Sequence, residues 1–291
     1  MDIEKIKAIL SSVQQKVSET SDAILEKIPI EEILFKSMKL PMVKINREAF
    51  LKKELKGKCT EKQIQIAIDN NPAFAGIERS VIDPIAKQVI NYETNKVSAI
   101  SFAAGLPGGA AMVGTIPADI TQYFGFILRV MQQLAYLYGF EQFNLNEEEV
   151  NVDTMNRVMI FLGVMFGVQG ANAGVKYVAQ TAAKKVSKTL AQKALTKGTV
   201  YPIVKKIAKA LGIRMTKQIF ANSVSKIVPV IGGVTTGGLT YLTFKPSAKK
   251  LQKSFLELNL CNPEYYKNPE NFSESTIFED YSEEPDEFRE E

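Results

Sequence analysis

The sequence of 291 residues contains no histidine and only two cysteines, Cys59 and Cys261. Without histidine, the chain has no Ser–His or Cys–His nucleophile pair and no histidine-containing zinc motif, and two cysteines cannot complete a tetrathiolate site. We therefore expect no metal ion and no cofactor, and the sequence favours a protein that is not an enzyme. The start of the chain lacks the basic and apolar regions of a secretory signal, so we expect a reduced, cytoplasmic protein.

Acidic residues are absent from residues 154–256, a basic block that carries 17 lysines or arginines. The residues before this block include 17 basic and 20 acidic side chains, and residues 257–291 include 2 and 12, so the net charge of +4 hides a strong partition. A solvated helix face is the ordinary explanation for a series of lysines. Such a face usually intersperses glutamate with lysine, because opposite charges four residues apart stabilise a helix and like charges repel. The missing acids therefore favour an anionic partner.

The spacing of apolar residues predicts an all-α protein. Steps of three and four over residues 2–27 predict an amphipathic helix that packs across its own domain or, alternatively, pairs as a coiled coil. Asn46 predicts the start of a helix that ends near Gly57, and Thr60 with Gln63 forms a capping box for a helix through Asp69. Another helix is expected over residues 82–90. We divide the chain into amphipathic N-terminal helices (1–40), one helical domain (41–256) and an acidic, disordered tail (257–291).

Three runs without charged residues, 97–118, 158–175 and 227–244, each contain glycines four residues apart. Small residues at this spacing allow helix backbones to approach closely, so we expect the three runs to pack on one another. Pro107 with Gly108 and Gly109 predicts a kink between two helical arms, and Pro229 with two Gly-Gly pairs predicts a helical hairpin in the third run. Membrane-spanning helices are the alternative, which these interruptions and a mean hydropathy of −0.05 disfavour.

A polar stripe follows the apolar helix that we expect after Pro117, whose missing N–H suits a first helical turn, and Gly139 predicts the end of this helix. Its members Asp119, Gln122, Arg129 and Gln133 form the one polar constellation that suggests a small-ligand pocket. Asp119 and Arg129 are ten residues apart, which is about 15 Å along a helix, so each requires a partner from another element. The alternative is structural: Asp119 stabilises the helix start, and Arg129 binds backbone carbonyls of a neighbouring helix.

Several motifs in this central part are shared with a known family. They are GLPGG at residues 105–109, from Gly105 through Pro107 to Gly109, PADI at 117–120 and RVMQQLAYLYG at 129–139. Together with residues 71–77 and 228–233, these motifs resemble the EcsC family over residues 45–250. The resemblance implies a bacterial helical protein without an established catalytic role, named for the third component of an ABC-transporter operon that is linked to secretion and regulated proteolysis. A membrane transporter or a protease system is then an expected partner.

Two basic amphipathic helices are expected between the second and third uncharged runs. Apolar residues of 202–211 share one face and its lysines face away, and the preceding helix repeats this pattern less regularly. Anionic lipids attract such segments at about 1 kcal/mol per lysine near the bilayer surface. The sequence therefore predicts a protein peripheral to the cytoplasmic face of the cell membrane, and the residues that we expect to contact the anionic surface are Lys184, Lys185, Lys188, Lys205, Lys206 and Lys209.

Nucleic acid is a second candidate partner for the same lysines. The basic block contains only two arginines, its tyrosines are scattered and no recognised motif is present, so we rank nucleic acid below a membrane. The acidic tail adds a further hypothesis. On a flexible tether, its carboxylates compete with an external anionic surface for nearby lysines. A tail that only increases solubility is the alternative.

Overall fold

The computed structural model describes residues 30–105, 116–145, 152–183, 204–207, 209–210 and 231–268, together with residues 202 and 271. These residues form helices and no β-strand, so the predicted all-α fold is confirmed. The α-helices are α2 (Ile30–Met38), α3 (Arg47–Leu55), α4 (Glu61–Asp69), α5 (Arg79–Gly105), α6 (Ile116–Leu137), α7 (Val152–Met165), α8 (Ala171–Ala183) and α11 (Ile231–Leu256). Short 3-10 helices are η1 (Pro41–Val43), η3 (Asn259–Cys261) and η4 (Pro263–Lys267).

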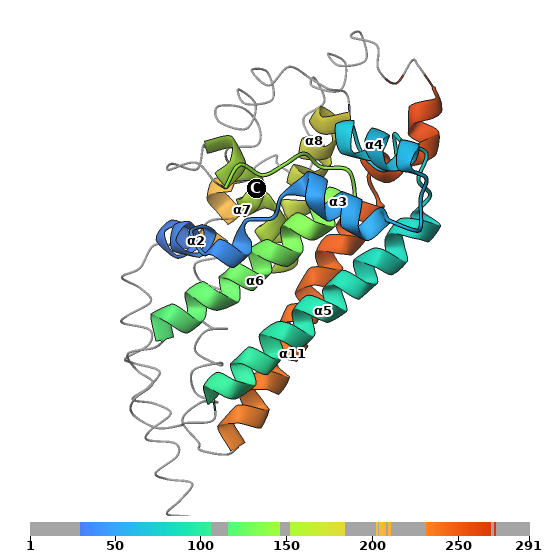
Figure 1. Cartoon of the computed structure of the whole chain (residues 1–291). Helices are drawn as coiled ribbons and strands as arrows, with labels where there is room; N and C mark the ends of the chain where they lie inside the picture. Colours follow the sequence, from blue (N-terminus) through green and yellow to red (C-terminus); the bar gives the residue numbers. More distant parts are fainter. Residues whose placement is uncertain are drawn as a thin grey trace, which may run out of the picture.

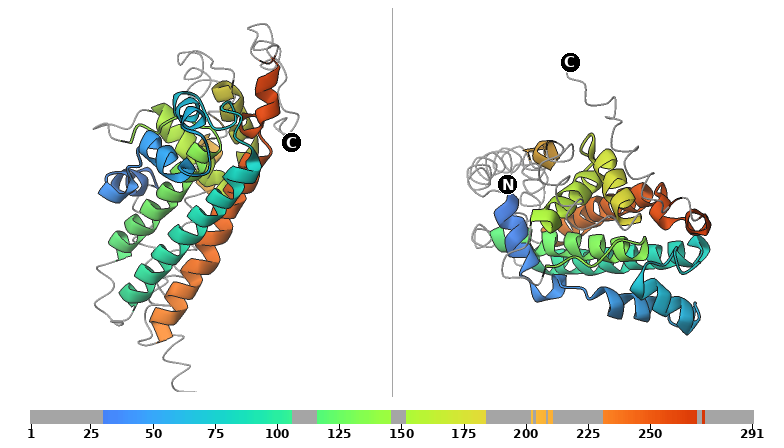
Figure 2. Two further views of the ribbon diagram at one scale, coloured as in Figure 1. Left: turned by 45° about the vertical axis from the view of Figure 1, so that its right-hand side comes forward. Right: turned by 90° about the horizontal axis from the view of Figure 1, so that it is seen from above.

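The long helices α5, α6 and α11 run side by side, and the shorter helices pack on their sides and at one end (Figures 1 and 2). Side-chain contacts fix their register. Arg129 of α6 pairs with Glu93 of α5, whereas Tyr138, further along α6, donates its hydroxyl hydrogen to Asp83, which is earlier in α5. The two helices are therefore antiparallel. The Tyr123 ring meets the Phe244 ring of α11 with centroids 6.1 Å apart, and Gln252 reaches Tyr138, so α11 is parallel to α6.

Helix α6 is the most buried element. Between Phe124 and Phe140 only Arg129 is partly exposed, because α2, α3, α5, α11 and the η1 segment pack on α6 and the Phe161 ring of α7 meets Phe140 just after it. The helix begins at Ile116, which places Pro117 in its first turn as predicted. Gly139 follows the last turn with a φ of +99°, a left-handed conformation that favours glycine. The predicted C-terminal stop at Gly139 is confirmed.

Aromatic side chains fill the space between α6, α7 and α11. Phe161 of α7 is the centre of this group, with ring centroids 5.0 Å from Phe140, 5.9 Å from Phe143 and 5.1 Å from Phe255. Edge-to-face and tilted arrangements of this kind add about 0.5–1.5 kcal/mol per pair beyond the area that they bury. Three segments that are distant in sequence therefore share one core.

The predicted N-terminal caps of α3 and α4 are confirmed. The Asn46 side chain accepts the Ala49 N–H at 2.8 Å, and Thr60 with Gln63 forms a reciprocal capping box. Arg47 is buried, and it donates to the Ala67, Ile68 and Asn70 carbonyls at the end of α4 and to the Phe140 carbonyl after α6. Burial lowers its pKa from the ordinary value, but a guanidinium stays protonated in proteins. Arg47 therefore ties α3, α4 and α6 together.

The glycines of the second uncharged run have two different roles. Gly163 lies where α7 meets other elements, since a Cβ placed there would be 2.9 Å from Ala171 Cβ and 3.0 Å from Ile207. Gly167 and Gly170 instead form the turn between α7 and α8, with φ of +68° and +83°. The run is therefore two helices joined by a glycine turn, and the expectation that both glycines of each pair serve close helix packing is wrong for Gly167 and Gly170.

The third uncharged run does not form the predicted hairpin. Helix α11 continues from Ile231 to Leu256 through both Gly-Gly pairs and through Pro246. It packs along α5 and against α7, and the burial of Phe244, Ala248, Leu251 and Phe255 marks its inner face. Each glycine costs a helix only about 1 kcal/mol relative to alanine, so packing on one face outweighs the loss.

The start of the acidic segment is also ordered, in contrast to the prediction that the chain is disordered from residue 257. Helices η3 and η4 follow α11, and Leu258, Leu260 and Cys261 are buried. Burial raises the pKa of the Cys261 thiol. The predictions for the helix at residues 2–27, for the kink at Pro107, Gly108 and Gly109 and for the remaining tail lie outside the described residues.

Candidate functional site

The outer side of α11 carries several lysines and no acidic residue. Lys245, Lys249 and Lys253 follow one another at steps of four residues, and Lys250 stands beside them. Lys249, Lys250 and Lys253 are exposed, and none of them has a carboxylate partner among the residues that the structure describes. We call the four side chains the α11 lysine row. Four ammonium groups thus lie within three turns of one helix, which contains no acidic residue; the first acid after them is Glu257, four residues beyond Lys253.

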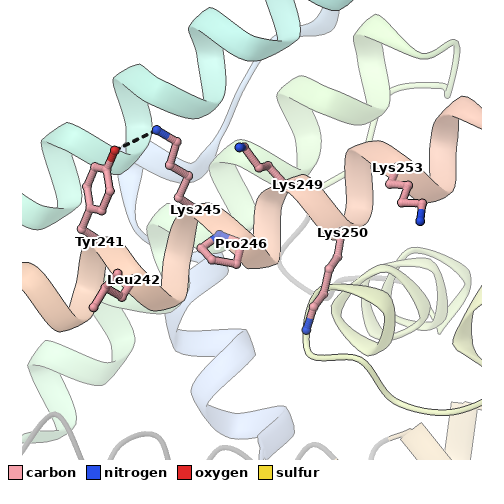
Figure 3. A pocket seen from close by; sticks show the side chains of 7 residues that line it. All are labelled: Tyr241, Leu242, Lys245, Pro246, Lys249, Lys250 and Lys253. Carbon is pink, nitrogen blue, oxygen red and sulfur yellow. Dashed lines mark hydrogen bonds between the residues drawn. The ribbon is translucent and has the colours of Figure 1, made fainter.

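The α11 lysine row borders an open hollow of about 360 Å³ whose other lining residues are Tyr241, Leu242 and Pro246 (Figure 3). Lys245 Nζ donates to the Tyr241 hydroxyl at 2.8 Å and lies 4.9 Å from the centre of its ring. Pro246 has no N–H, so the Leu242 carbonyl lacks its usual helical donor at this exposed position. The hollow therefore combines cationic groups, an apolar floor and an available acceptor.

The interior of the protein fixes the direction of these lysines. Phe244, Ala248, Leu251 and Phe255 are fully buried on the opposite side of α11, and their spacing of four, three and four residues defines a helix face. A rotation of α11 that turned the lysines inward would expose these apolar side chains to water. The core therefore holds the α11 lysine row at the surface.

A second basic surface confirms part of the prediction for residues 202–211. Val204 and Ile207 are buried, and Ile207 packs against Gly163 of α7. Lys205, Lys206 and Lys209 are exposed, so the apolar face docks on the body and the lysines face outward, as expected. Lys184, Lys185 and Lys188 lie outside the described residues.

Of the predicted polar stripe, the structure describes the side chains of Gln122, Arg129 and Gln133. Arg129 Nε donates to Glu93 Oε1 at 3.0 Å, and its Nη1 donates to the Met42 carbonyl at 2.6 Å. Gln133, one turn further, is buried. Gln122 is partly exposed, and the side chain of Asp119 lies outside the described part. The first motif is described only at Gly105, where α5 ends.

Glu93 is a buried carboxylate that the sequence reasoning missed. Its side chain is fully buried, and its second oxygen, Oε2, has no partner within the described ranges; the same holds for Gln133 Oε1. A sequence signal exists, because Glu93 falls on the apolar stripe formed by Ile82, Ile85, Val89, Ile90 and Val97 of α5. An acid at such a position predicts a buried pair whose partner must come from another helix.

The pairing of Arg129 with Glu93 favours the structural interpretation of this region. The guanidinium is already neutralised by Glu93 and donates to the Met42 carbonyl, so an anionic ligand would have to compete with a buried carboxylate. Within the described residues, no three histidine, cysteine or acidic side chains are arranged to hold a metal ion. The ion pair joins α5 to α6 and to the η1 segment.

The α11 lysine row is the second feature that sequence reasoning missed. These lysines were counted in the basic block, but a hairpin was predicted in residues 227–244. Lys245 was therefore not assigned to the same helix as the apolar residues before it. The spacing of Lys245, Lys249 and Lys253 at four residues is the signal that identifies one helix face.

No family model, no curated protein and no solved structure matches this chain.

Proposed function

We propose that this chain is a non-enzymatic helical protein that associates with the anionic, cytoplasmic face of a membrane. The observation that carries the proposal is the α11 lysine row, which has no described acidic partner and borders exposed Tyr241 and Leu242. Each lysine near an anionic surface contributes about 1 kcal/mol of attraction. Among the described helices, none combines the length and the apolar character that a bilayer span requires.

The exposed Lys205, Lys206 and Lys209 support the same proposal, because they add three cations on a helix whose apolar side is already occupied by the body. The resemblance to the EcsC family extends it: the membrane partner that we propose is a transporter or a protease system. A ligand pocket at Arg129 is less well supported, since Glu93 already occupies the guanidinium.

The test is co-sedimentation with vesicles that contain phosphatidylserine, compared with vesicles of phosphatidylcholine alone. A variant with Lys249→Gln, Lys250→Gln and Lys253→Gln removes three cations from exposed positions. At about 1 kcal/mol per lysine, its affinity for anionic vesicles is expected to fall about a hundredfold.

The matched control removes three exposed lysines of α3, α4 and the segment between them, with Lys52→Gln, Lys56→Gln and Lys62→Gln. It changes the net charge by the same amount and is expected to bind nearly as well as the unmodified chain. Equal losses in the two variants would show that net charge, and not the α11 lysine row, governs binding. Binding to single-stranded DNA but not to anionic vesicles would favour the nucleic-acid alternative.

A further inference from the structure

The hollow beside the α11 lysine row combines cations with exposed apolar side chains. Leu242, which is 70% exposed, and Pro246, which is also exposed, form its apolar floor. Figure 3 shows Lys249 and Lys250 pointing to opposite sides of α11, so cations lie on both sides of the helix next to this floor. A partner that matches the hollow therefore carries negative charges on both sides of an apolar or aromatic side chain. A series of carboxylates alone would leave the floor in contact with water.

One segment of the chain itself has this composition. Residues 279–284 have the sequence Glu-Asp-Tyr-Ser-Glu-Glu, in which two acids precede Tyr281 and two more follow it after one serine. No lysine or arginine lies between Lys267 and Arg289. We call residues 279–284 the acidic-aromatic segment, which lies outside the described residues. Its charges are opposite to those of the α11 lysine row, and its one aromatic ring matches the apolar floor.

The length of the acidic-aromatic segment also matches the hollow. An extended chain covers about 3.3 Å per residue, so its six residues cover about 20 Å. A helix rises about 1.5 Å per residue, so the part of α11 from Leu242 to Lys253 is about 17 Å long. One extended segment can therefore contact the apolar floor and the lysines at the same time.

The described chain ends close enough for this segment to reach α11. Cys261 Sγ donates to the Phe255 carbonyl, so the chain after α11 folds back on the last turn of that helix. Asn271 Nδ2 donates to the Tyr265 carbonyl at 2.7 Å, which holds Asn271 beside η4. These two bonds and the length of η4, about 10 Å, place Asn271 roughly 20 Å from Phe255. The chain from Asn271 to Glu279 spans up to about 28 Å when extended, so the segment reaches the lysines from the C-terminal end of α11.

We infer that the acidic-aromatic segment docks on the hollow of α11 and runs antiparallel to the helix, with Tyr281 on Leu242 and Pro246 and the carboxylates beside the α11 lysine row. This inference rests on the proposed function, since it names what competes with anionic lipid for the same lysines. Attraction by charge alone would distribute the acids over every exposed lysine of the protein. The contact of Tyr281 with the apolar floor selects one place.

The tether makes weak contacts sufficient for docking. Exposed ion pairs are individually weak, but a segment of the same chain is present at an effective concentration of about 1 mM. Contacts with a dissociation constant of about 1 mM then keep the segment docked for about half of the time. An anionic membrane offers many phosphates at once, so it displaces the segment when the protein binds.

The test uses tryptophan as a probe, because the chain has none of its own. Tyr281→Trp places an indole in the acidic-aromatic segment, and Phe288→Trp places one seven residues further along, outside it. Each probe is combined with the three substitutions in the α11 lysine row and, separately, with the three control substitutions in α3, α4 and the segment between them. Emission and its quenching by acrylamide are recorded for the full-length chain, first without lipid and then with phosphatidylserine vesicles.

Docking predicts that the substitutions in the α11 lysine row shift Tyr281→Trp emission to the red and increase its quenching by acrylamide about twofold, since a half-docked segment is released. The control substitutions are expected to leave Tyr281→Trp emission unchanged, and Phe288→Trp emission should change little in either background. Phosphatidylserine vesicles should shift Tyr281→Trp emission to the red as lipid displaces the segment.

Three results would contradict different parts of this account. Equal Tyr281→Trp emission in the two lysine backgrounds would overturn the docking site, because the segment would then show no preference for α11. Vesicle binding that leaves Tyr281→Trp emission unchanged would overturn the competition with lipid. Loss of co-sedimentation for the unmodified chain would overturn the proposed function itself, whereas docking is measured independently of it, without lipid.

Discussion

Glu93 is a fully buried carboxylate, and Arg129 is the cation that neutralises it. Arg129→Met would leave this carboxylate without its counter-charge, and breaking a buried pair in this way costs about 3–5 kcal/mol. We expect the variant to lose that amount of unfolding free energy in urea titrations. Adding Glu93→Leu to Arg129→Met should recover much of the loss, since no unpaired charge then remains. A stable Arg129→Met variant that had lost vesicle binding would instead support a functional site at Arg129.

Tyr136 makes the stability of the folded protein depend on pH in the alkaline range. Burial raises its pKa from 10.0 to about 12. In the unfolded chain the Tyr136 phenol loses its proton near pH 10, whereas in the folded protein the phenol stays protonated up to about pH 12. Folding therefore becomes less favourable as pH rises from about 10 to about 12. The contribution is fully present below pH 10 and amounts to about 3 kcal/mol.

The measurement for Tyr136 is urea unfolding at several pH values in that window. The Tyr136→Phe variant has no ionisable phenol, so its stability should decline less between pH 10 and pH 12 than that of the unmodified chain. The other tyrosines and the lysines are shared by both proteins and cancel in the comparison. Parallel declines would show that Tyr136 ionises at its ordinary pH in the folded state.

The turn between α7 and α8 separates two kinds of glycine that the sequence does not distinguish. Gly167 needs its left-handed φ of +68°, a conformation that asparagine tolerates, and its site is exposed. Gly163 has no room for a side chain beside Ala171 and Ile207. We expect Gly167→Asn to cost less than about 1 kcal/mol and Gly163→Asn more than about 2 kcal/mol through overpacking. Thermal unfolding of both variants checks the difference, and similar losses would contradict these roles.

Local signals predicted the elements that depend on local chemistry. The caps at Asn46 and Thr60 and the stop at Gly139 involve residues within a few positions of one another, and all three are confirmed. The hairpin in residues 227–244 was predicted from glycine and proline content, but the long contact between α11 and α5 keeps one helix there. Propensity is a weak guide where packing over many residues opposes it.

In the candidate site too, a feature set by one helix was predicted, and a feature set by contact between helices was not. The outward direction of Lys205, Lys206 and Lys209 was predicted, because the apolar face of one helix determines it. The Glu93–Arg129 pair was not predicted, since its members are 36 residues apart and their meeting depends on the register of α5 and α6.

Basic and acidic residues are concentrated in different parts of the chain, and removal of its last residues tests whether the two parts interact. Residues 272–291 contain nine acidic side chains and one arginine. Removal of these residues is expected to tighten binding to phosphatidylserine vesicles at low salt, because a tethered acidic segment competes for lysines at high effective concentration. The difference between the two proteins should shrink as salt rises. Equal binding at every salt concentration would leave the segment with a solubilising role only.

Partition of the unmodified chain onto vesicles with increasing phosphatidylserine content is the most direct test of membrane association through the α11 lysine row. We expect the partition coefficient to rise steeply with the anionic fraction and to fall as salt screens the lysines. The variant with Lys249→Gln, Lys250→Gln and Lys253→Gln should show a much shallower rise. A partition coefficient that is the same on neutral and anionic vesicles would contradict the account.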